Sequence, residues 1–273
     1  MKKTQLYYWI IILAFGFGFF VKSAFYSPFD ENEREDKPIA HFEVPKVFQP
    51  DAPLHLNHQK RKYINPYFPT FLGKFPFSTH LAIDNQRYFI ADEDYLFHNG
   101  DSIETYAGDG LQLIPAPQIK LAELPYYRLD DSAHFPVFIV NETPLTKAIE
   151  GKDGYLFAIQ EAIDSNGMWR PIEQRGSDFC GNGRWGLKIY PQEYCVFLMP
   201  LYEGSYFTKL RVRFRNGDNT IVSKSYKGMI SYEQFYFEPD SEMKKHFIHS
   251  PLGIVNGTCY GSYPLEYSQL SSR

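Results

Sequence analysis

Four basic residues recur at every second position of one segment: Lys209, Arg211, Arg213 and Arg215. The positions between them are apolar: Leu210, Val212 and Phe214. Strict alternation predicts a β-strand with one buried face and one basic face, on which the charges stand about 6–7 Å apart. We call these four residues the basic ladder. It suits docking of an anionic envelope polymer, lipid headgroups or an acidic partner; the alternative is a solvated face whose charges discourage edge pairing.

The cysteines suggest one covalent bond and no redox chemistry. Cys180 and Cys195 are 15 positions apart and bracket a turn-like Gly-Asn-Gly. In an oxidising compartment they are the candidate disulfide, which would stabilise the fold by about 3 kcal/mol. Two buried reduced thiols are the alternative. Cys259 is left over, and the absence of a Cys-x-x-Cys pattern disfavours redox catalysis.

Other chemistry is weakly indicated. His55 and His58 are three positions apart, but Pro53 and the lack of helical periodicity argue against a metal-binding helix face. The acidic run at 92–94 lacks the spacing of a calcium loop, and no Gly-x-Ser-x-Gly motif is found. We therefore assign no catalytic residue, no metal ligand and no cofactor. An envelope enzyme with its active site in a cleft between two β regions remains the alternative.

The N-terminus predicts a membrane anchor over residues 1–26. Lys2 and Lys3 precede an uncharged apolar run from Leu6 to Val21. The run is slightly short for a membrane span, and flanking residues can extend it. Because the basic residues precede the run, the N-terminus should stay cytoplasmic and the body should be periplasmic or extracellular, as in a single-pass protein. A cleaved signal peptide is the competing interpretation, although the cleavage site is poor.

The rest of the chain predicts β structure. An acidic linker spans 27–40, a Pro- and aromatic-rich irregular β region spans 41–130, and a tail spans 239–273. Between them, 131–238 contains about seven short runs with regular turn signals, typical of an antiparallel sandwich. Hairpins are expected at Asn166-Gly167 and at Asn216-Gly217. An aromatic content of 18% also favours β-sheet.

The segment from Val137 to Phe237 resembles a bacterial immunoglobulin-like or fibronectin-III-like domain of cell-envelope proteins. The resemblance rests on FIVNET at 138–143, on the hairpin ending in Asn166-Gly167-Met168-Trp169, and on EGSYFTKLRVRF at 203–214. It implies an antiparallel sandwich that acts as a spacer or a binding module, and it supplies no catalytic residues. Antibody-type domains are not matched, because Trp169 precedes both Cys180 and Cys195.

Net charge and predicted membrane topology limit the classes of function that this chain can have. A net charge of −4 disfavours nucleic acid as a partner. The sequence therefore predicts a membrane-anchored, extracytoplasmic all-β protein with a binding or structural role in the cell envelope, such as a subunit of a membrane complex. The expected partners are the membrane, through the N-terminal helix, and another envelope protein or an anionic polymer.

Overall fold

The computed structural model describes residues 40–49, 55–82, 95–98, 108–122, 132–176 and 182–267, with the backbone alone for 95–98. The chain divides into two units, Met1–Pro38 and Ile39–Arg273. The predicted anchor at 1–26 and all but the last residue of the predicted linker lie outside the described residues. Within the described part, no helix is both long and apolar enough to cross a membrane.

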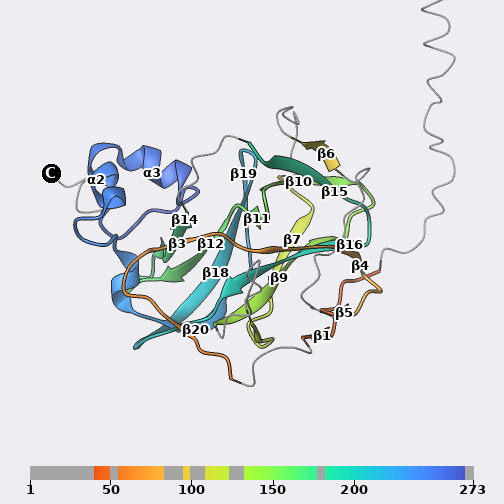
Figure 1. Ribbon diagram of the computed structural model, residues 1–273, viewed down its shortest axis with the longest axis horizontal. Coiled ribbons are helices and arrows are strands. Elements are labelled where there is room, and N and C mark those ends of the chain that lie inside the picture. Colours follow the sequence, from red (N-terminus) through yellow and green to blue (C-terminus); the bar gives the residue numbers. More distant parts are fainter. Residues whose placement is uncertain are drawn as a thin grey trace, which may run out of the picture. The chain divides into compact units, whose positions relative to one another are not determined.

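Three antiparallel sheets make up most of the second unit (Figure 1). The central sheet has the order β4-β16-β9-β7, with β8 also paired to β9; its strands are β4 (Phe71–Pro76), β7 (Leu111–Pro115), β8 (Leu121–Ala122), β9 (Ala133–Asn141) and β16 (Glu193–Pro200). Another of the three sheets has the order β11-β10-β15-β6. Its strands are β6 (Tyr95–His98), β10 (Lys147–Lys152), β11 (Tyr155–Leu156) and β15 (Arg184–Ile189).

The sheet that carries the basic ladder, which we call the ladder sheet, has the order β13-β12-β18-β19, with β20 also paired to β18. Its strands are β12 (Ala158–Ile163), β13 (Trp169–Pro171), β18 (Tyr206–Asn216), β19 (Asn219–Val222) and β20 (Tyr226–Ile230). Three parallel two-stranded pairs complete the described strands: β1 (Val47–Phe48) with β5 (Leu81–Ala82), β2 (Gln59–Lys60) with β17 (Tyr202–Glu203), and β3 (Asn65–Tyr67) with β14 (Glu173–Arg175). The all-β prediction is therefore confirmed, whereas the immunoglobulin-like topology stays a prediction.

The largest core lies where the three sheets face one another. It combines Phe135 and Val137 from β9, Leu187 from β15, and Val212 and Phe214 from β18. The opposite face of the central sheet buries a second cluster, in which aromatic rings of N-terminal and central-sheet residues meet: Phe42, Phe138 and Tyr194. Burial on both faces explains why every residue of β9 is buried and why this strand lacks polar alternation.

Both predicted hairpins form as the turn residues require. In the β12–β13 hairpin, Gly167 has φ 78°, and the carboxylate of Asp164 accepts hydrogen bonds from the backbone of Asn166 and Met168. In the β18–β19 hairpin, Asn216 pairs directly with Asn219, and Gly217 has φ 59°. Glycine adopts positive φ without a Cβ penalty, so these turns fix the register of their strands.

The sheets cross the sequence boundary expected at residue 130. Strands from the Pro-rich region pair with strands from the next region: β4 with β16, β7 with β9, and β6 with β15. A short 3-10 helix, η3 (Tyr232–Phe235), precedes the predicted tail. The tail belongs to the same unit and contains α2 (Glu242–His249) and α3 (Pro251–Gly257). Phe247 and Val255 of these helices are buried against Ile159 on the outer face of the ladder sheet.

Candidate functional site

The basic ladder lies on β18, and its alternation is as predicted. Leu210, Val212 and Phe214 are buried on one face. On the other face the four basic residues differ from one another. Lys209 is exposed and Arg215 is partly exposed, whereas the side chains of Arg211 and Arg213 are only 19% and 17% exposed. Two of the four are thus largely withdrawn from solvent.

The reason is a buried carboxylate on the neighbouring strand. Glu161 of β12 is the direct register partner of Arg211 and is 1% exposed. Its two carboxylate oxygens lie 2.6 Å from Nε of Arg211 and 3.0 Å from Nε of Arg213. The Ser262 hydroxyl donates a third contact to it, at 2.5 Å. Two guanidinium groups therefore compensate one buried charge, as a buried carboxylate requires.

The C-terminal segment, residues 239–267, covers the same part of the sheet. Arg213 Nη1 donates to the Tyr260 carbonyl at 3.2 Å, and Arg215 Nη1 donates to the Asn256 carbonyl at 3.1 Å. The Arg211 guanidinium lies over the Trp169 ring, 4.2 Å from its centroid. The structure corrects the expectation of one continuous, exposed basic row, because the chain itself engages three of the four ladder residues.

Beyond the C-terminal segment, the outer face of the ladder sheet is open to solvent. Lys209 faces Lys227 of β20, and Phe207 faces Met229, as direct cross-strand partners. All four are exposed. On the other side of β18, Ile163 pairs with Trp169, and both are partly exposed. Because alternate residues share a face, these six side chains form one surface, which we call the open face: Ile163, Trp169, Phe207, Lys209, Lys227 and Met229.

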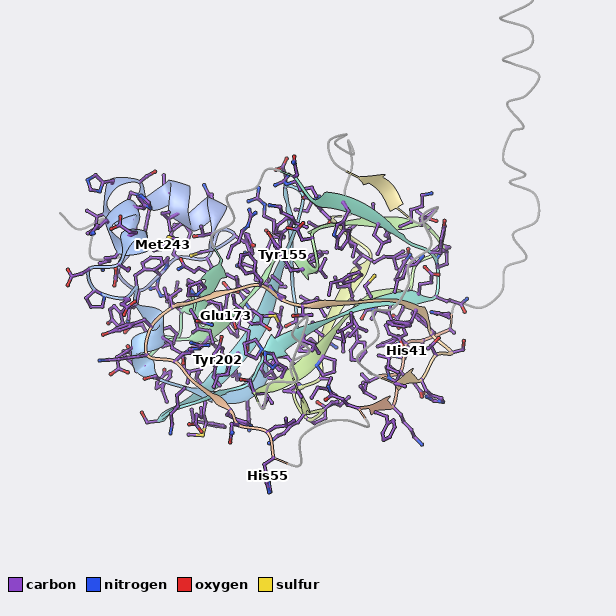
Figure 2. The ribbon with its side chains drawn as sticks, viewed as in Figure 1. His41, His55, Tyr155, Glu173, Tyr202 and Met243 are labelled. Carbon is purple, nitrogen blue, oxygen red and sulfur yellow. The ribbon has the colours of Figure 1, made fainter. Side chains whose placement is uncertain are left out.

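A second buried carboxylate, Glu173 of β14, lies inside the fold beside Tyr202 (Figure 2). The Tyr202 hydroxyl donates to its Oε1 at 2.6 Å. Gln160 donates twice, from its side-chain Nε2 to Oε1 at 2.8 Å and from its backbone N–H to Oε2 at 2.7 Å. Burial raises the pKa of Glu173 to about 7, and the hydrogen bonds from Tyr202 and Gln160 oppose that rise.

The Glu173 network connects several strands. Gln160 of β12 also donates to the Pro200 carbonyl at the end of β16, at 2.9 Å, and accepts from the Tyr226 hydroxyl of β20 at 2.6 Å. Asn65 of β3 reaches the Tyr202 hydroxyl at 3.5 Å. Glu173 itself has no exposed surface. The arrangement can lock these strands in register, and in this structure it does not present the carboxylate to a substrate.

The other sequence-level candidates do not converge on a site. His55 is exposed and His58 is partly buried (Figure 2 labels His55), and the described residues contain no group of three or more side chains suited to hold a metal ion. Cys195 is buried in β16, but Cys180 lies outside the described residues, so the disulfide stays a prediction. Cys259 is fully buried, and burial raises the pKa of its thiol to about 12.

The two glutamates were missed by sequence reasoning for a simple reason. Glu161 and Glu173 both look like polar positions of ordinary half-exposed strands, and partners such as Arg211, Ser262 and Tyr202 come from other segments. The only local signal is that two adjacent polar residues in AIQEAI cannot both point to solvent if the strand alternates.

Comparisons of the chain with protein-family models, with curated proteins and with solved structures found no match.

Proposed function

We propose that this chain is a membrane-anchored, extracytoplasmic protein of the cell envelope that acts by binding or as a structural subunit of a membrane complex. The observation that carries the binding role is the contrast between interior and surface. The buried carboxylates Glu161 and Glu173 are held by the chain's own donors, whereas the open face leaves apolar and basic side chains in solvent. Buried carboxylates that are fully hydrogen-bonded within the chain stabilise the fold. Exposed apolar side chains on a sheet are available to bind a partner.

The membrane part of the proposal rests on the sequence. Lys2 and Lys3 precede the uncharged run from Leu6 to Val21, and acidic residues follow it. This charge asymmetry supports an N-terminus in the cytoplasm and an exported body. An immunoglobulin-like or fibronectin-III-like identity for 131–238 is part of the same proposal; it is supported by the antiparallel hairpins of that region and by its resemblance in sequence.

An envelope enzyme is the second candidate, because one observation favours it. Burial raises the pKa of Glu173 to about 7, and shifted carboxylates often mark catalytic sites. The full burial of Glu173 and its three donors favour a structural role for it instead. We therefore prefer the binding role.

Protease accessibility tests the topology. The full chain, produced in a bacterial host with a C-terminal tag, should lose its body when protease is added to intact spheroplasts. A cytoplasmic protein in the same cells serves as the control for lysis. Replacing residues 1–26 with a cleavable signal peptide should release the body from the membrane fraction. Full protection of the body in spheroplasts would refute the proposed topology.

A further inference from the structure

The open face places two like charges opposite one another, with no acidic residue among its six members. Lys209 and Lys227 are direct cross-strand partners on adjacent antiparallel strands, and both are exposed. Like charges directly opposite one another destabilise a sheet. On the covered part of the same sheet face, the comparable problem at Arg211 and Arg213 is solved by the buried carboxylate of Glu161. None of the six residues that form the open face is acidic, so a negative charge from outside the sheet would relieve the repulsion.

The apolar members of the open face lie next to the two lysines. Phe207 is 63% exposed and Met229 is 44% exposed, and they are cross-strand partners two positions beyond the lysine pair. Trp169 lies on the same face, beside Ile163. Figure 1 shows α2 and α3 well away from β20, so these helices leave the pair uncovered. An apolar tip bordered by lysines and a tryptophan is the arrangement of a protein surface that rests on a bilayer.

We propose that the open face docks on anionic phospholipid headgroups, with Phe207 and Met229 entering the interface and Lys209 and Lys227 binding phosphates. This inference rests on the proposed function, which places the body beside a membrane. Residues 27–40 separate the predicted anchor from the body, and about 14 residues reach no further than roughly 50 Å when extended. The tether therefore keeps the face at a high local concentration of lipid.

A lipid fits the face better than an acidic protein. Lysine pairs and exposed apolar side chains need no fixed geometry from their partner, and headgroups supply mobile phosphates above an apolar phase. A surface that binds an acidic protein would more often contain arginine, which is enriched at protein–protein interfaces. On this sheet the arginines Arg211, Arg213 and Arg215 are engaged by the chain itself.

Photocrosslinking of the full chain tests the proposal. Benzoylphenylalanine is placed at Phe207 or, as a matched control, at Phe48, which is also 63% exposed but belongs to β1. Each protein is reconstituted into nanodiscs of phosphatidylcholine alone or with phosphatidylglycerol. We expect lipid adducts at position 207 in the anionic discs, several-fold above those at position 48, and a decrease in 0.5 M salt.

A second variant tests the charge requirement. Lys209→Ser with Lys227→Ser should lower the adduct yield at position 207 by about 25-fold, since each lysine near an anionic surface contributes about a fivefold gain. Equal yields at 207 and 48, or no dependence on phosphatidylglycerol, would overturn the proposal. So would adducts to a protein or to a second copy of the chain when the same probe is activated in cells. A chain that fails to insert into discs contradicts the proposed anchor, whereas one that inserts without forming lipid adducts contradicts only the docking.

Discussion

Glu161 and Glu173 are buried to the same extent, 1% and 0% exposed, but the fold accommodates them in opposite ways. Glu161 faces two guanidinium groups and a hydroxyl at the contact between the ladder sheet and the C-terminal segment. Glu173 is met by an amide side chain, a backbone N–H and a phenol, all neutral. The first solution compensates charge with charge; the second leaves the carboxylate close to protonation at neutral pH. The two sites should therefore respond differently to mutation and to pH.

Removing both cations from Glu161 should have the largest effect. Arg211→Met with Arg213→Met leaves a buried carboxylate without a cation, and the free energy of unfolding should fall by about 3–5 kcal/mol. Urea unfolding of the full chain in detergent, followed by circular dichroism, measures this. The control is Lys209→Ser on the same strand, which should change stability by no more than about 0.5 kcal/mol because its charge is solvated. If the double variant is as stable as the control, the Glu161 contacts do not hold the C-terminal segment in place.

The pH dependence of stability should come next in size. The folded pKa of Glu173 is about 7, above its ordinary value of 4.5, so folding favours the protonated carboxyl. Its contribution to stability is complete below about pH 4.5 and is lost as the pH rises through 7. Between pH 5 and pH 8 we expect a loss of roughly 2–3 kcal/mol from this group. The slope should be absent in Glu173→Gln, which is expected to be less stable overall but flat in pH; an unchanged slope in that variant would assign the titration to another group.

Loss of the Tyr202 hydroxyl, which donates to Glu173, should have the smallest of the three effects on stability. Tyr202→Phe removes one of its three donors and should destabilise the fold by about 1.5–3 kcal/mol at pH 8, where the carboxylate is ionised. At pH 5 the loss should be smaller, because a protonated carboxyl needs fewer donors. Unfolding at the two pH values measures the difference. Tyr263→Phe, at an exposed phenol, is the control. Equal losses for Tyr202→Phe at both pH values would show that the hydrogen bond does not depend on the charge of Glu173.

Local sequence signals predicted what depends on neighbours in the chain. The glycines of Asn166-Gly167 and Asn216-Gly217 identified both hairpins, because the turns need positive φ at those points. The alternation from Phe207 to Arg215 identified the buried face of β18, because the period of a strand is fixed by its geometry. These features need no knowledge of distant segments.

What the sequence concealed depends on distant partners. The basic ladder looked uniformly solvated because Glu161 and Tyr260, which engage it, lie about 50 positions away in either direction along the chain. Helix α2 could have been predicted from a serine at its N-cap position. Ser241 caps the helix by accepting a hydrogen bond from the Lys244 backbone N–H at 3.2 Å. The short parallel pairs, such as β3 with β14, have no local signal, since two or three residues define no periodicity.

The order in which partners appear along the chain has a consequence for how the body folds. β2 and β3 pair with β17 and β14, and Asn65 reaches Tyr202 across 137 positions. β4 likewise pairs with β16, which is synthesised more than 110 residues later. β1 finds its partner β5 early, but β2, β3 and β4 have no partner strand until β14, β16 and β17 have left the ribosome or translocation channel. Such long-range pairing predicts slow folding that is completed only late in synthesis, and a nascent chain whose unpaired strand edges need protection until then.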